Sequence, residues 1–115
     1  MEKNQLWPFA GLRVLDLSTE IAGAYATKLL LDSGAEVIKV EPPTGDPLRS
    51  WTASGQQLGP DEDGALFDFL NASKRSAVID LETEAGKSDF LELVSTVDLV
   101  FESFAPGTLD ALGLT

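Results

Sequence analysis

The sequence predicts an α/β fold: a Rossmann-like parallel sheet with flanking helices. Short runs of branched apolar residues predict strands, and longer stretches with apolar residues three or four positions apart predict helices. The two kinds of segment alternate along the chain, which is typical of a doubly wound sheet with parallel strands. The chain has 115 residues, which is the length of one domain spanning residues 1–115.

The first strand–helix–strand unit lies near the amino terminus. Residues 12–17 (LRVLDL) and 36–40 (EVIKV) are short and rich in branched apolar residues, so both are expected to be strands. Residues 20–33 between them carry apolar side chains at helical spacing. Two strands joined through one helix form a right-handed βαβ unit with parallel strands.

The helix predicted over residues 20–33 has signals at both ends. Ser18 or Thr19 would cap its first turn, where Glu20 suits the positive end of the helix dipole. Gly34 would end the helix. The two apolar series that define its period are Ile21, Tyr25, Leu29 and Ala22, Ala26, Leu30.

Residues 41–64 are expected to form a long loop, because four of the six prolines fall within them. A loop of this length is unusual inside a compact domain and is usually functional or mobile. A short helix over residues 65–71 would end it.

The remaining segments repeat the alternation. Strands are expected at residues 76–81 (SAVIDL) and 97–103 (VDLVFES), with a helix at 83–94 capped by Thr83. The inward-facing residues of that helix would be Phe90, Leu91 and Val94. Another helix begins near Thr108 just before the sequence stops, so we expect a fragment of a longer protein.

Composition argues against several classes of function. The formal net charge is -11, so neither nucleic acid nor an anionic membrane surface is an expected partner. The chain contains no cysteine and no histidine, and its acids show no metal-ligand spacing, so we expect no metal. Without a span-length apolar run or a signal-peptide core in residues 1–11, a cytoplasmic protein is expected.

Each candidate site has a plain structural alternative when the residues are taken alone. A helix start after the first strand suits an anion, but only Gly23 stands where a dinucleotide fingerprint needs three glycines. Glu41 is either a ribose-hydroxyl acceptor or a solvated acid. Lys74 and Arg75 either meet phosphates or lie in a solvated turn. Phe104 either stacks on a base or caps the core.

A series of motifs runs through the chain in a fixed order. The segments are GLRVLDLSTEIAGAYATKLLLDSGAEVIKVEPPTGDPLR, then FLNASKRSAVIDLETEAG, then DLVFESFAPGTLDALGL. They are close to the patterns G-x-x-V-L-D, A-G-P, L-G-A-x-V-I-K-V-E-x-P, N-x-x-K-R-S and V-x-E-N-F-x-P-G, whose order and spacing agree from Gly11 to Leu114. The chain therefore resembles the amino-terminal part of the class III CoA-transferases, a family that includes formyl-CoA and carnitine-type CoA-transferases and α-methylacyl-CoA racemases.

The resemblance implies a Rossmann-like CoA-binding region from a larger protein that forms interlocked homodimers. Such transferases move CoA between an acyl-CoA and a carboxylic acid, through an enzyme-bound anhydride and a thioester. Coenzyme A is thus the expected substrate. The family's nucleophilic aspartate lies downstream of the matched segment, so the resemblance implies no catalytic residue in this chain.

The resemblance also implies contacts with CoA at matched positions. The implied contacts are Ile21, Ala22, Asn71, Lys74, Arg75 and Phe104. Departures from the family pattern include three replacements: Ala24 replaces a proline, Ser103 an asparagine and Ala111 an arginine. In addition, Pro42 stands where some relatives have an arginine. Because lost cations and donors weaken the hold on CoA phosphates, a degenerate domain that serves assembly stays open as an alternative. A fragment of a racemase, from the other branch of the family, is a second alternative.

Overall fold

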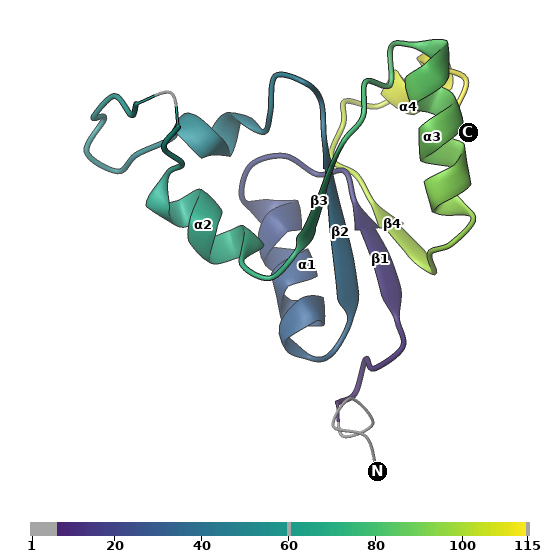
Figure 1. The fold of residues 1–115 in the computed structure, drawn as a ribbon, viewed down its shortest axis with the longest axis horizontal. Helices are drawn as coiled ribbons and strands as arrows, with labels where there is room; N and C mark the ends of the chain where they lie inside the picture. Colours follow the sequence, from purple (N-terminus) through teal and green to yellow (C-terminus); the bar gives the residue numbers. More distant parts are fainter. Residues whose placement is uncertain (1–6, 60, 115) are drawn as a thin grey trace.

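A four-stranded parallel sheet forms the centre of the molecule, in the order β3-β2-β1-β4 (Figure 1). The strands are β1 (Arg13–Asp16), β2 (Glu36–Glu41), β3 (Arg75–Val78) and β4 (Leu99–Phe101). This computed structural model describes residues 7–59 and 61–114; the residues 1–6 used in the signal-peptide argument, Pro60 and Thr115 lie outside the described part. The predicted α/β fold with a parallel sheet is confirmed.

Five helices connect and cover the strands in the described part of the chain. They are α1 (Ala22–Asp32), η2 (Pro47–Ser50), α2 (Ala65–Asn71), α3 (Glu84–Val94) and α4 (Thr108–Ala111). The sequence did not predict η2, a 3₁₀ turn inside the long loop. Among the residues described, no helix has the length and apolar character needed to cross a membrane.

The two faces of the sheet receive different helices, because successive strand residues point to opposite sides. Val14 and Val37 pack on one face with residues of α1, while Leu15 and Ile38 pack on the other with Phe90 of α3. Many of the most deeply buried side chains therefore belong to β1 and β2, the two central strands. Because all four strands are parallel, their carboxyl ends meet at one edge, which is the upper edge in Figure 1.

The predicted cap of α1 is wrong. The N-cap position is Ile21, and within the described residues no side chain caps it. Ser18 instead donates its hydroxyl and its backbone N–H to the carboxylate of Asp16. The buried residues of α1 are Ala24 and Thr27, because this face contacts Asp16 at the end of β1.

Of the other local predictions, some are confirmed and one is wrong. Thr83 caps α3 as predicted, accepting from the Gly86 N–H at 2.9 Å. Gly34 follows the end of α1 with a φ of 112°, a conformation that favours glycine. Phe90 is buried, but the inward prediction for Leu91 is wrong because its side chain is 56% exposed.

Candidate functional site

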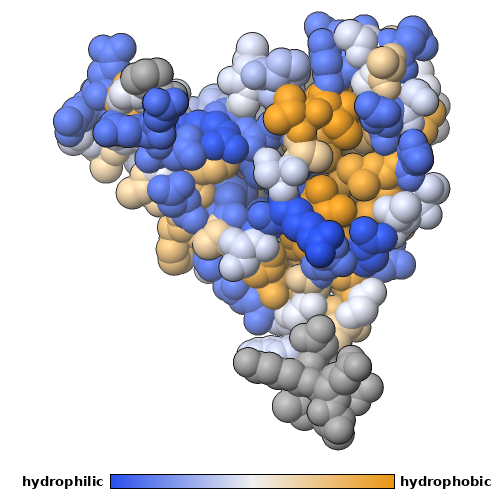
Figure 2. Space-filling view, in the orientation of Figure 1, coloured by the Kyte–Doolittle hydropathy of each residue, from blue (hydrophilic) through white to orange (hydrophobic). Residues whose placement is uncertain are grey.

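A cleft of about 460 Å³ lies beyond the carboxyl ends of the strands. Hydrophobic side chains gather at this end of the molecule, in the upper part of Figure 2. Open parallel sheets bind ligands at this position. The wall residues come from four segments: Leu17 and Thr19; Val40, Glu41, Pro42, Pro43 and Thr44; Ile79, Asp80, Leu81 and Glu82; and Phe104, Thr108 and Leu112.

The β1–α1 turn, residues 17–21, is one wall of the cleft and is held from two sides. The Thr19 N–H donates to Ser103 Oγ at 3.0 Å, and the Glu20 N–H donates to Asp46 Oδ1 at 3.1 Å. Glu20 has a φ of 67°, in the left-handed region that a non-glycine residue seldom adopts. Since no described side chain caps α1, its first N–H groups remain suited to an anion or a carbonyl oxygen.

Asp16 and Lys74 form a buried ion pair beneath this turn. Their side chains are 0% and 1% exposed, and Lys74 Nζ lies 3.2 Å from Asp16 Oδ2. Lys74 also donates to the Ala24 carbonyl oxygen at 3.0 Å and to Asn71 Oδ1 at 2.8 Å. Burial lowers the pKa of Lys74, and the nearby carboxylate of Asp16 offsets part of that shift. All three N–H bonds of the ammonium therefore meet protein acceptors.

Lys39 and Asp46 form a second buried pair on the same side of the sheet. Lys39 Nζ lies 2.9 Å from Asp46 Oδ2, with side chains 2% and 1% exposed. The ammonium donates its hydrogen bond to the Ser18 carbonyl oxygen at 3.1 Å, so Asp46 Oδ2 is held by charge and not by an aligned hydrogen bond. This pair joins β2 to the loop that follows it.

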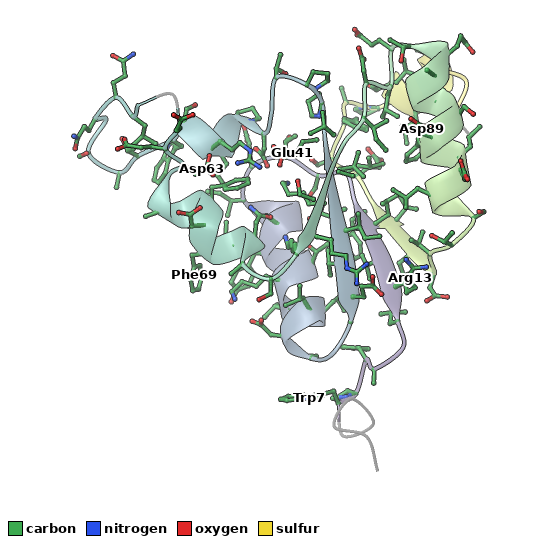
Figure 3. The ribbon with its side chains drawn as sticks, viewed as in Figure 1. Trp7, Arg13, Glu41, Asp63, Phe69 and Asp89 are labelled. Atoms are coloured by element: carbon green, nitrogen blue, oxygen red, sulfur yellow. The ribbon has the colours of Figure 1, made fainter. Side chains whose placement is uncertain are left out.

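Glu41 and Arg49 form a third pair at the end of β2. Arg49 donates to both oxygens of Glu41 at 2.8 and 2.7 Å, donates to Asp63 at 2.9 Å, and lies over the ring of Phe67 at 4.2 Å. Figure 3 labels Glu41 at the end of β2 and Asp63 in the loop before α2. Burial raises the pKa of Glu41, but hydrogen bonds from Arg49 and Asp46 and the charges of Arg49 and Lys39 outweigh it, so the pKa is lowered.

This lowered pKa predicts a stability loss in acid. A carboxylate whose pKa is lower when folded stabilises the fold above its unfolded pKa, 4.5, and loses that contribution as pH falls through the folded value. We expect Glu41→Gln to reduce the free energy of unfolding at pH 7, with the difference from wild type shrinking below pH 4.5. Urea unfolding from pH 7 to pH 3 measures this. The exposed Glu92→Gln is the control, and a difference independent of pH would contradict the prediction.

The residues that the resemblance assigned to CoA contact lie in different surroundings. Phe104 lines the cleft. Ile21 lines a neighbouring hollow of about 220 Å³ with Pro47 and Trp51 among its walls. Ala22 is exposed at the start of α1.

The three polar residues of that assignment are separated from Phe104. Asn71 and Lys74 lie together in the buried network, where the Asn71 amide also donates to the Phe67 carbonyl oxygen at 3.1 Å. Arg75 has a side chain 73% exposed and lies 3.3 Å from a carboxylate oxygen of Glu36. The structure thus brings all three residues to one hollow of about 180 Å³, where the side chain of Arg75 stays on the surface, and none of them lines the cleft that Phe104 lines.

Sequence reasoning missed three residues that organise the site: Asp16, Lys39 and Asp46. Asp16 and Lys39 are charged residues inside strongly apolar strand segments, LRVLDL and EVIKV. A charge in such a segment is a signal for a buried partner, since buried charges are paired. Asp46 gave a weaker signal, because loop residues of this kind are usually solvated.

Comparison with known proteins gives one consistent result. The sequence model of CoA-transferase family III matches residues 9–115. A probable fatty acyl-CoA transferase of Mycobacterium tuberculosis is 42% identical over 113 residues, which are 96% of this chain and 28% of that protein. Formyl-CoA:oxalate CoA-transferase of Streptomyces avermitilis is 42% identical over 106 residues, 91% of this chain and 25% of that enzyme.

Solved structures are similar over the same region. A CAIB/BAIF family protein from Brucella suis superposes with a TM-score of 0.84 at 38% identity, covering 95% of this chain and 29% of that chain. The crystal structure of the Mycobacterium tuberculosis protein gives a TM-score of 0.81 at 41% identity, covering 95% of this chain and 29% of that chain. This chain therefore spans between 25% and 29% of the length of these proteins.

Proposed function

We propose that this chain, which belongs to CoA-transferase family III, is the amino-terminal CoA-binding portion of an enzyme that moves CoA from an acyl-CoA to a carboxylic acid. Several relatives at about 40% identity are named as CoA-transferases, among them an acetyl-CoA:oxalate CoA-transferase from Acetobacter aceti that is 40% identical. We further propose that the complete enzyme is a cytoplasmic homodimer.

The observation that carries this proposal is the cleft at the carboxyl ends of the strands. Its apolar walls suit the pantetheine arm, and Phe104 offers an aromatic surface for the adenine base. The free N–H groups at the start of α1, near Ile21 and Ala22, suit a carbonyl or phosphate oxygen. CoA bound there would lie against the backbone of the β1–α1 turn.

The remaining proposed CoA contacts are Asn71, Lys74 and Arg75, whose side chains differ in how far a ligand can reach them. Arg75 is exposed and can approach a phosphate directly. Lys74 reaches a phosphate only by releasing one of its three protein acceptors, so we propose that it acts first by holding Asp16 and the Ala24 carbonyl beneath the turn.

We assign no catalytic residue to this chain. A nucleophilic carboxylate must be able to reach the acyl carbon of the substrate. Asp16 is fully buried among its donors, and Glu41 is held by two N–H groups of Arg49. In keeping with the family resemblance, we propose that the nucleophilic aspartate lies in sequence that follows this segment.

Two measurements test the function on the protein expressed from its complete reading frame. Isothermal titration with CoA should give saturable binding, and an acyl-CoA mixed with a free carboxylic acid should yield the exchanged acyl-CoA. Absence of binding at millimolar CoA would refute the proposal. Exchange of the α-proton with deuterated water in the absence of an acceptor acid would instead favour the racemase.

A substitution at Ala111 separates CoA binding from a degenerate domain that serves assembly. Ala111 is exposed on α4, one position before the cleft residue Leu112. Ala111→Arg should tighten CoA binding by about 3- to 10-fold, because a guanidinium there can pair with a phosphate. The control Ala53→Arg places the same charge on the loop before α2, and equal affinity for both variants and wild type would favour the degenerate domain.

A further inference from the structure

Asp46 joins both walls of the cleft through one buried carboxylate. Its Oδ1 accepts from the Glu20 N–H at 3.1 Å and from the Leu48 N–H at 2.9 Å, and its Oδ2 lies 2.9 Å from Lys39 Nζ. We call these three contacts the Asp46 bridge. Through them a residue of the loop after β2 holds the turn after β1, which lies 26 residues earlier in the sequence.

One contact of the Asp46 bridge is with Glu20, whose backbone conformation is unfavourable for a residue other than glycine. Glu20 has a φ of 67°, and a glutamate in this left-handed region persists only when its surroundings hold it there. The N–H of Glu20 is directed at the Asp46 carboxylate, and a hydrogen bond to a charged acceptor is among the stronger ones. Asp46 is thus positioned to hold Glu20 in this conformation.

Both segments that the bridge joins carry cleft residues. Thr19, next to Glu20, lines the cleft on one side, and Pro42 to Thr44, just before Asp46, line it on another. The backbone N–H of Asp46 also donates to Glu41 Oε2 at 2.7 Å, so the loop is tied to the end of β2 as well. Movement of Asp46 would therefore change both walls together.

We propose that Asp46 is a positioning residue for CoA: it sets the shape of the cleft by fixing the β1–α1 turn, without touching the ligand. This inference rests on the proposed CoA-binding function. Lys39 has a supporting part, because its ammonium balances the carboxylate and also holds the Ser18 carbonyl oxygen of the same turn. If Asp46 had a purely structural role, its substitution would change only the stability of the fold. If it has a positioning role, its substitution also changes the affinity for CoA and the protection of the Glu20 amide from hydrogen exchange.

The test uses the full-length protein and three substitutions. Asp46→Ala should weaken CoA binding by about tenfold or more, the scale expected when a hydrogen bond to a charged acceptor is lost. Asp46→Asn keeps an acceptor for the Glu20 N–H and should bind CoA more tightly than Asp46→Ala. The control Asp61→Ala removes an exposed carboxylate of the same loop region that does not line the cleft, and should leave CoA affinity unchanged.

A suppressor makes the mechanism specific. Glycine adopts a positive φ without strain, so adding Glu20→Gly to Asp46→Ala should recover most of the lost CoA affinity. Hydrogen exchange of the peptide that contains Glu20 gives a readout without CoA, and Asp46→Ala should speed exchange there by about tenfold.

The outcomes separate the inference from the proposed function. If the wild-type protein fails to bind CoA, the proposed function falls, and the positioning role falls with it. If wild type and Asp46→Ala bind CoA equally, only the positioning role is refuted. The positioning role would also be overturned if Asp46→Ala left hydrogen exchange at Glu20 unchanged, or if the double variant bound CoA no more tightly than Asp46→Ala. It is supported if Asp46→Ala lowers CoA affinity and the added Glu20→Gly restores it.

Discussion

Lys74→Ala should lower the free energy of unfolding by about 3 to 5 kcal/mol, the cost of breaking a buried ion pair by removing one partner. The substitution leaves the carboxylate of Asp16, which is 0% exposed, without its counter-charge. It also removes the donor that holds the Ala24 carbonyl oxygen and Asn71 Oδ1. Urea unfolding at pH 7 measures the change.

The neighbouring cation provides a matched control. Arg75 is exposed and pairs with Glu36 at 3.3 Å on the surface, so Arg75→Ala should cost about 1 kcal/mol or less. The two substitutions remove the same charge from adjacent positions, and the contrast isolates burial. Equal effects would show that the buried pair does not stabilise the fold in the way argued, and Lys74→Met, which keeps much of the apolar stem, would then distinguish lost packing from lost charge.

Gly86→Ala should destabilise the protein by about 1 to 3 kcal/mol, although helix propensity alone predicts a gain of roughly 1 kcal/mol. Gly86 lies in the first turn of α3, and a Cβ there would overlap the carbonyl oxygen of Asp80 and lie 2.9 Å from Thr83 Oγ1. Relief of this overlap requires α3 to move away from the segment that follows β3. The capping hydrogen bond of Thr83 would be disturbed as well.

Thermal unfolding and urea unfolding of Gly86→Ala and Ser88→Ala test this sign reversal. Ser88 is exposed on the same helix, so its replacement should change the free energy of unfolding by no more than about 0.5 kcal/mol. If Gly86→Ala were more stable than wild type, the segment after β3 would be able to move away from the added Cβ with little loss of free energy, and helix propensity would determine the sign of the effect.

Local patterns in the sequence predicted most of the elements and could not predict what their polar residues contact. The helix expected at residues 83–94 forms at Glu84–Val94 with its predicted cap, because a cap and a 3.6-residue period depend only on nearby residues. The cap predicted for α1 failed because Asp16, at the end of β1, takes the Ser18 hydroxyl. Lys74 carried a motif, but its buried position depends on β1, which lies 58 residues away.

The order of residues along the chain was enough to predict the alternation of strands and helices, the parallel sheet and the family. Those properties follow from apolar periodicity and from the order of motifs, which any reader of the chain can follow from residue to residue. The partners of the charged residues at the ends of β1 and β2 follow instead from the packing of distant segments: Asp16 pairs with Lys74, Lys39 with Asp46, and Glu41 with Arg49. A buried charge pairs with the opposite charge that the folded chain brings close to it. An unpaired charge away from water destabilises the fold by more free energy than local conformational preferences contribute.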